Sequence, residues 1–422
     1  MQTNLVEPFA HTKQGREAEA ILRACVHCGF CTATCPTYQL VGDELDGPRG
    51  RIYLMKMVLE GETPSRKTQL HLDRCLTCRA CETTCPSGVQ YGRLVDIGRA
   101  AVDARVRRPL SERIMRRVLR GIVPYPKRFG FFYRLGRLAP QRWSRGMCKA
   151  PRRLEAASWP TNHGLKRKML ALDGCVQPVA APATNAAAAR VLAKLGIELV
   201  RPEGAGCCGA ISHHLTAPEE ARAFMRRNID AWWPHIDAGA EALVMTASGC
   251  GAMVREYGHW LRDNPEYAAK SARVSELTRD LSEVLARENL QALAGVGRGR
   301  RIAWHSPCTL QHGQKIVGMV EGILRTAGFE LTPVRDSHLC CGSAGTYSLL
   351  QRKLSEPLLH NKLDALQEGQ PAVIATANIG CQLHLGSESG VPVHHWIELL
   401  DEPGLASQGG FQPARTQWRG PA

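Results

Sequence analysis

Cysteine is the residue whose number and spacing in this sequence point most directly to chemistry. The chain has 17 cysteines in 422 residues, and they are clustered rather than scattered. Eight lie between Cys25 and Cys85, and eight of the other nine form two similar sets in the C-terminal half. Because a thiolate is both a ligand for soft metals and a redox-active group, this clustering indicates a metal-binding or redox protein.

The first eight cysteines form two copies of one motif. Residues 25–36 read CVHCGFCTATCP, and residues 75–86 read CLTCRACETTCP. Both have the C-x2-C-x2-C-x3-C-P spacing of bacterial two-cluster ferredoxins, in which the fourth cysteine binds the cluster of the other motif. Three closely spaced cysteines can hold three corners of a cubane, but their loop is too short to reach the fourth corner.

We therefore expect two [4Fe–4S] clusters with interleaved ligands. The first is expected to bind Cys25, Cys28, Cys31 and Cys85. The second is expected to bind Cys75, Cys78, Cys81 and Cys35. Structural zinc also uses C-x2-C pairs, but zinc needs only four ligands and leaves the third cysteine of each motif unexplained. Disulfides are rare in the cytoplasm, which is where we expect a chain whose first residues contain no secretory signal.

The C-terminal half contains an internal duplication. The spacing of cysteines recurs after 133 positions for three of them and after 131 for the fourth. The flanking sequences agree as well, GCCGA with LCCGSAG and ALVMTASGC with AVIATANIGC, so two copies of one domain are predicted. The first repeat contains Cys175, Cys207, Cys208 and Cys250. The second repeat contains Cys308, Cys340, Cys341 and Cys381.

Each of these four-cysteine sets is a candidate site for a further iron–sulfur cluster. Gly209 and Gly342 follow the paired cysteines and would let the backbone approach a bulky inorganic group. The alternative is that the thiols are structural, since a buried free cysteine packs as a small apolar side chain. The second repeat is favoured because it adds His305, His338 and His384, and imidazole can bind iron, although each histidine alone is more often structural.

The remaining sequence predicts the elements that position these cysteines. Between the first two motifs, Ile52, Met55 and Leu59 recur at helical spacing. In the repeats, the apolar runs ALVMTA and AVIATA alternate with helical stretches, which is typical of α/β domains with parallel strands. The fold class is thus α+β and multidomain, with a helical ferredoxin-like domain before a tandem pair of α/β domains. The expected boundaries are 1–98, 99–168 (a connector), 169–297, 298–405 and a tail at 406–422.

The net charge of +15 is concentrated in the connector, which has 20 Lys and Arg against three Asp and Glu. Within it, Ile114, Val118 and Ile122 fall on one helical face and the arginines largely on the opposite face. Such a helix can lie on an anionic membrane surface or pack on the protein's own core or a partner subunit. No nucleic-acid recognition module accompanies the charge, and no run of ~20 apolar residues could cross a bilayer.

The repeats resemble the cysteine-rich CCG domain of heterodisulfide reductases and related respiratory subunits. In that family the last cysteine is often part of a C-x2-C pair, whereas here Met253 and His384 stand at the final position. Over the whole chain, segments such as ILRACVHCGFCTATCPTYQL, DSHLCCGSAGTY and TANIGCQLHL are similar to the iron–sulfur subunit of bacterial glycolate oxidase.

The resemblance implies a chain that transfers electrons and has no catalytic residue of its own. It implies partner subunits whose FAD oxidises glycolate to glyoxylate, no FAD in this chain, and delivery of electrons to a quinone at the cytoplasmic face of the inner membrane. The small subunit of anaerobic glycerol-3-phosphate dehydrogenase has a similar domain order and is the main alternative. A catalytic heterodisulfide-reductase-like subunit and a metal-free scaffold for the flavoprotein are further alternatives.

Overall fold

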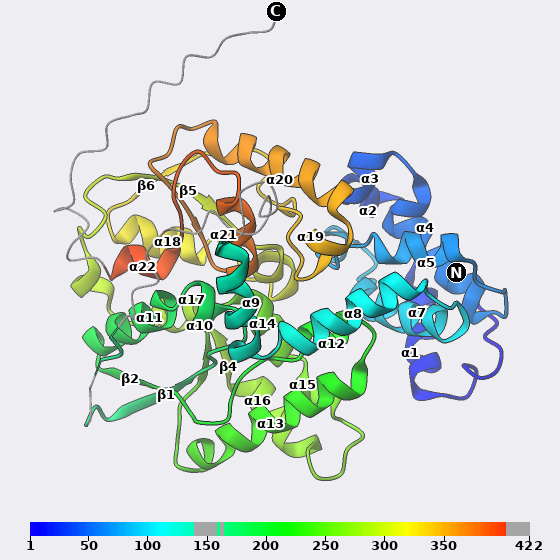
Figure 1. The fold of residues 1–422 in the computed structure, drawn as a ribbon, viewed down its shortest axis with the longest axis horizontal. Coiled ribbons are helices and arrows are strands. Elements are labelled where there is room, and N and C mark those ends of the chain that lie inside the picture. The colour runs from blue at the N-terminus through cyan, green and yellow to red at the C-terminus, as the bar shows by residue number, and fades with distance from the viewer. Residues whose placement is uncertain (139–157, 161–163, 402–422) are drawn as a thin grey trace, which may run out of the picture.

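The computed structural model describes residues 1–138, 158–160 and 164–401 (Figure 1). The end of the connector, the expected tail and Cys148 lie outside these residues. The sixteen cysteines within them are all free thiols. Within the same residues, no helix combines the length and the apolar character needed to span a membrane.

The N-terminal domain is entirely helical and lies at one end of the molecule (Figure 1). Its elements are α1 (Lys13–Ala24), α2 (Phe30–Ala33), α3 (Pro36–Val41), η1 (Glu44–Asp46), α4 (Pro48–Leu59), α5 (Arg66–Asp73), α6 (Ala80–Thr83) and α7 (Tyr91–Arg105). Ile52, Met55 and Leu59 are buried, as predicted for the helix between the motifs. The boundary expected at residue 98 falls inside α7, whose Ala101 and Val102 still belong to this core.

The first repeat is an α/β domain with a four-stranded parallel sheet in the order β2-β1-β3-β4. Its strands are β1 (Arg167–Ala171), β2 (Ile197–Val200), β3 (Leu243–Met245) and β4 (Thr278–Asp280). Its helices are α10 (Gln177–Ala180), α11 (Ala183–Lys194), α12 (Ala210–His214), α13 (Pro218–Asp237), α14 (Ser248–Val254), α15 (Tyr257–Trp260), α16 (Ala268–Leu277), α17 (Leu281–Leu285) and η2 (Leu290–Leu293). The predicted strand ALVMTA becomes β3.

The second repeat has the same topology, with the parallel order β6-β5-β7-β8. Its strands are β5 (Arg301–His305), β6 (Glu330–Thr332), β7 (Val373–Thr376) and β8 (Val393–His395). Its helices are η3 (Thr309–Gly313), α18 (Met319–Thr326), α19 (Tyr347–Leu350), α20 (Arg352–Gln367), α21 (Ile379–Gly386) and α22 (Trp396–Leu400). In each repeat the first and last cysteines follow the two central strands, and the paired cysteines follow an edge strand. All four thus come after the carboxyl ends of parallel strands, where ligands bind.

The two repeats share one hydrophobic core. Ala187, Ala188 and Ala189 on α11 are at most 2% exposed and belong to the same buried cluster as Trp396 on α22. The backbone also crosses the junction, since the amide of Ser248 donates to the carbonyl of Ala377 at 3.0 Å. Small alanine side chains allow α11 to pack closely against α22. The repeats therefore form one continuous structure rather than two separately packed domains.

The connector contains two helices, α8 (Leu110–Ile122) and α9 (Pro126–Leu138), which run from the N-terminal domain towards the first repeat (Figure 1). Two arginines of α8 face inward, where Arg116 pairs with Asp73 at 3.1 Å and Arg120 with Glu220 at 3.6 Å, whereas Arg113 and Arg117 are exposed. The apolar side of α8 faces outward, with Ile114 54% exposed. The interpretation that this side packs on the protein's own core is therefore wrong for Ile114 and Val118, although the adjacent Leu119 is buried.

Glycines after the paired cysteines have a structural reason of their own. Gly209 and Gly342 have φ of +90° and +89°, in the left-handed region that favours glycine. A Cβ on Gly342 would lie 2.7 Å from the carbonyl oxygen of Ser355 on α20. The position is thus explained by close approach to a helix backbone within the repeat, which the sequence interpretation did not include.

We predict that Gly342→Ala weakens the local structure of the second repeat. A side chain there is strained and meets α20, so the opening free energy of nearby amides should fall by about 2 kcal/mol. Native-state hydrogen exchange measures this quantity. The matched control is Gly322→Ala on α18, where the new Cβ has no neighbour within 4 Å. Equal protection in both variants would contradict the explanation.

Candidate metal centres

The two N-terminal cysteine loops have the same backbone conformation. His27 and Thr77, at matching positions before the second cysteine, have φ of +57° and +54°. Gly29 and Arg79, after it, are also left-handed. This conformation curls each loop and turns amide groups towards sulfur, as in the contact between the Thr77 amide and Cys75 Sγ at 3.4 Å. Amide hydrogen bonds to sulfur are one means of tuning an iron–sulfur cluster.

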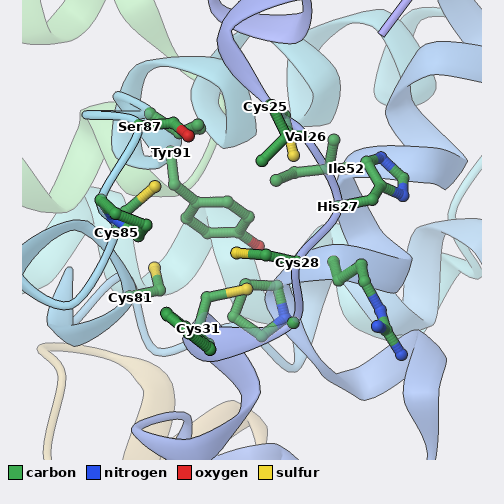
Figure 2. Close-up of a pocket in the computed structure, with 16 residues that line it drawn as sticks. Cys25, Val26, His27, Cys28, Cys31, Ile52, Cys81, Cys85, Ser87 and Tyr91 are labelled. Carbon is green, nitrogen blue, oxygen red and sulfur yellow. The ribbon is translucent and has the colours of Figure 1, made fainter.

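The first pocket of the N-terminal domain is lined by cysteines from both loops (Figure 2). They are Cys25, Cys28, Cys31, Cys81 and Cys85. The first three come from one motif, whereas Cys85 crosses over from the other. The set therefore contains all four residues expected around the first cluster, together with Cys81 on the wall shared with the second pocket.

The second pocket lies beside the first and reverses the arrangement. Its cysteines are Cys35, Cys75, Cys78 and Cys81. Three come from the second motif and Cys35 crosses over from the first. Tyr91 lines both pockets, so little more than one side-chain layer separates them. At least four soft thiol donors converge in each largely apolar pocket, and such a set fits an iron–sulfur cluster.

Buried arginines hold the second pocket together. Arg51, 1% exposed, lines the pocket and pairs with the fully buried Asp46 at 3.3 Å. Arg99 donates to the carbonyls of Leu72 and Cys75 at 2.9 and 2.7 Å, which fixes the start of the second loop. A buried cation next to a group of thiolates stabilises their negative charge. Neither arginine belongs to a motif, so neither was predicted from the sequence.

Burial raises the pKa of several thiols in these pockets. Burial and the neighbouring Cys25 raise the pKa of Cys31 to about 11. Burial, with Cys308 and Cys35 nearby, raises the pKa of Cys78 well above its ordinary value. Because thiolates crowd one another in a buried space, a cationic metal centre is what would allow them to ionise together.

In the first repeat, all four predicted cysteines come together. Cys207 lies between Cys175 and Cys208, and Cys208 contacts Cys250. Cys207 accepts hydrogen bonds from the two adjacent thiols and from the amide of Gly209, which lower its pKa. The surrounding side chains are mainly apolar, among them Phe224 and Met253.

In the second repeat, the four cysteines form the same chain of contacts, with Cys308 and Cys340 Sγ atoms 3.8 Å apart. A histidine joins them here. A ring nitrogen of His305 and the sulfurs of Cys341 and Cys381 all lie within 4.8 Å of one another. Burial, together with the nearby Lys362, lowers the pKa of His305 to about 3.

The other two histidines predicted near this set lie elsewhere in the arrangement. His384 has its Nε2 3.2 Å from the hydroxyl of Ser355. His338 uses its backbone carbonyl to bind the ring of His312 at 2.8 Å. Of the three, only His305 is grouped with the thiols among the residues that the structure describes.

The second pocket and the second repeat are neighbours. Cys78, Cys308 and Cys340 belong to one packed cluster with Leu76 and Tyr347. The hydroxyl of Tyr347 donates to the Arg74 carbonyl at 3.0 Å, and this bond fixes the contact between the domains. The N-terminal pockets and the second-repeat cysteines therefore form a continuous row of three thiol clusters.

Comparison with known proteins agrees with this arrangement. Residues 21–89 match the 4Fe-4S dicluster domain, and residues 169–255 and 302–386 each match the cysteine-rich domain. The chain is 55% identical over 405 residues to the glycolate oxidase iron-sulfur subunit of Escherichia coli K12, covering 95% of this chain and 99% of that protein. The chain belongs to this family.

More distant members of the comparison extend the pattern. The probable glycolate oxidase iron-sulfur subunit of Bacillus subtilis is 30% identical, over 92% of this chain and 95% of that protein. Lactate utilization protein A of Bacillus licheniformis is 28% identical over 51% of this chain and 91% of its own length. Like other glycolate oxidase iron–sulfur subunits, the chain is thus an iron–sulfur electron-transfer subunit of an oxidoreductase.

We predict that Cys78→Ser removes iron from this glycolate oxidase family member. The alcohol is a poor ligand for iron, and cluster binding is coupled to folding, so about four irons or more per chain should be lost. Colorimetric iron and sulfide determination on anaerobically purified protein measures this. Cys148→Ser, which removes the cysteine outside all the motifs, should keep its iron. A fully loaded Cys78→Ser chain would contradict the prediction.

Proposed function

We propose that this chain carries electrons from the flavin of partner subunits that oxidise glycolate to a quinone-type acceptor. The observation that carries the proposal is the continuous row of thiol clusters, from the first pocket through the second to the second repeat. A bound iron–sulfur cluster exchanges single electrons with little rearrangement, whereas a reduced flavin holds two electrons. The chain's role is to hold such centres close together and shielded from water.

Within this function, we assign one cluster to each N-terminal pocket. The first takes Cys25, Cys28, Cys31 and Cys85. The second takes Cys35, Cys75, Cys78 and Cys81. Cys81 borders both pockets, and its place in the second set rests on the motif spacing, because Cys85 fills the first.

A third cluster is proposed in the second repeat rather than in the first. Its thiols adjoin Cys78, so it extends the row, and it has a buried lysine beside the thiols. Lys362, 3% exposed, lies among these thiols, where its charge can offset that of thiolates. At the matching position of α13, Asn228 is neutral and makes hydrogen bonds with the Cys207 carbonyl and the Tyr257 hydroxyl.

The surface features at the two ends of the row of thiol clusters suggest where electrons enter and leave. Around the exposed Cys28, Val26 and Phe30 are 68% and 61% exposed, so a redox partner can approach the first pocket closely. At the other end, a surface pocket between α3 and α20 is lined by Cys340 and Lys362. We propose that electrons enter from the flavoprotein at the first pocket and leave at the surface pocket between α3 and α20.

The proposal predicts that glycolate-dependent dye reduction by the anaerobically purified complex needs this chain. Omission of the chain should abolish electron flow to a quinone analogue while the flavin is still reduced by glycolate, since the flavin and the acceptor are then no longer connected. Parallel assays with lactate and glycerol-3-phosphate separate the substrate alternatives. Reduction of the flavin by glycerol-3-phosphate alone would favour the alternative family, and undiminished quinone reduction without this chain would refute the role.

We further propose that α8 and α9 attach the chain to an anionic membrane surface. Their outward residues are Leu110, Ile114, Met115, Val118, Phe131, Phe132 and Leu135, all 45–67% exposed. The exposed charged residues among them are cationic, including Arg113, Arg117 and Arg128. A stripe of apolar side chains flanked by cations matches a bilayer interface with anionic headgroups.

The membrane proposal predicts that Ile114→Ser/Val118→Ser lowers binding to phosphatidylglycerol-containing vesicles by about tenfold or more, because two apolar side chains no longer enter the bilayer. Co-sedimentation at low and high salt measures binding, which should weaken with salt. Val317→Ser/Leu349→Ser removes side chains elsewhere that are at least as exposed and is the control. If the Ile114→Ser/Val118→Ser variant bound vesicles as the wild type does but no longer co-purified with the flavoprotein, this surface would instead be a subunit interface.

A further inference from the structure

The side chain of His305 is placed as a metal ligand would be. It ends β5 and is 2% exposed, with Nδ1 3.0 Å from the hydroxyl oxygen of Thr376. His305 and Thr376 are direct partners in the pairing of β5 with β7, so the sheet itself fixes the orientation of the ring. A histidine that binds metal through one nitrogen commonly has its other nitrogen held by a hydrogen bond of this kind.

The other ring nitrogen has no hydrogen-bond partner. Among the residues that the structure describes, none bonds Nε2 of His305, although the atom is buried. A buried polar atom left unpaired costs free energy, so such an atom in a native fold calls for an explanation. One nitrogen of this ring lies within 4.8 Å of the sulfurs of Cys341 and Cys381, and Nε2 is the ring nitrogen left available to a metal centre bound there.

We propose that Nε2 of His305 is an iron ligand in the second repeat, making this site a mixed imidazole–thiolate iron–sulfur centre. The assignment rests on the proposed cluster of the second repeat and names a ligand beyond its four cysteines. The neutral imidazole supplies a fifth donor without a fifth negative charge, in a pocket whose buried cation is Lys362.

The alternative position for such a ligand is His384, three residues after Cys381. Spacing along the chain favours it, because it occupies the place of the second cysteine in a C-x2-C pair. However, its Nε2 lies 3.2 Å from the hydroxyl of Ser355, which itself donates to the Gly342 carbonyl. The ring of His384 is therefore engaged on α20, whereas Nε2 of His305 is free.

The first repeat provides an internal comparison. The residue three positions before its first cysteine is Leu172, where the second repeat has His305. Leu172 is 4% exposed and packs in an apolar cluster with Cys208. A ligand difference at one matched position would make the two repeats bind metal differently despite equal numbers of thiols.

The test uses the full chain, purified anaerobically with its natural partners and reduced. Pulsed EPR of protein that carries histidine labelled with ¹⁵N only in the imidazole ring reports any imidazole nitrogen bound to a paramagnetic iron centre, and backbone amides do not carry this label. We expect a histidine-nitrogen coupling in the wild type and in His384→Leu, and its loss in His305→Leu, which copies the first repeat. His305→Cys should retain the iron and lower the reduction potential of this centre, because a thiolate adds negative charge.

Iron content separates failure of the ligand from failure of the site. About twelve irons per chain with a histidine coupling that persists in His305→Leu would overturn the assignment and leave the third cluster standing. About eight irons per wild-type chain would mean that the third cluster is absent, and this would overturn the assignment of His305 as a ligand. The two N-terminal clusters and the electron-transfer role would be unaffected. Loss of the coupling in His384→Leu alone would assign the ligand to His384 instead.

Discussion

The structure depends on thiols held close together where water is scarce. A buried cysteine is stable as a neutral thiol, but several of them facing one another cannot ionise together without a cation to share. The interleaved loops create this situation twice, and the duplicated sheets create it twice more. The surrounding side chains decide how the negative charge of each group of thiolates can be compensated. Arg51 and Lys362 place buried positive charge beside two of the groups, and His305 places a neutral nitrogen donor beside one.

Contacts between the domains fix the positions of the thiol clusters relative to one another. Thr83 on α6 bonds the ring of His312 in the second repeat at 2.9 Å, and Arg79 pairs with Glu256 of the first repeat at 2.6 Å. The N-terminal domain is thus attached to both repeats through residues next to its own cysteines. Because the attachments are short and partly buried, the separation between neighbouring thiol clusters is set by packing and not by a flexible tether.

Much of this could be predicted from sequence, because spacing along the chain encodes local geometry. The crossing of Cys35 and Cys85, the helix at α4 and the duplication all follow from periodicity and repeated intervals. The outward face of α8 could not be predicted, since a periodic pattern shows that two faces differ but not that Asp73 and Glu220 attract the charged one. The boundary at 98 failed for a similar reason: Gly98 packs on Met55 inside a continuing helix. The sequence offers three candidate histidines, and only the folded structure shows that His305 lies with the thiols of its repeat, with its ring oriented by strand pairing.

The core shared by the two repeats has a consequence for how the chain can evolve. Ala187–Ala189 and Trp396 pack across the junction, so each repeat completes the interior of the other. Deleting the first repeat would uncover the second, whatever the first repeat's own thiols bind. Selection for solubility alone then preserves a duplicated domain after its inherited chemistry has become dispensable. Either repeat could therefore lose the function of its cysteines and still be retained because it completes the interior of the other.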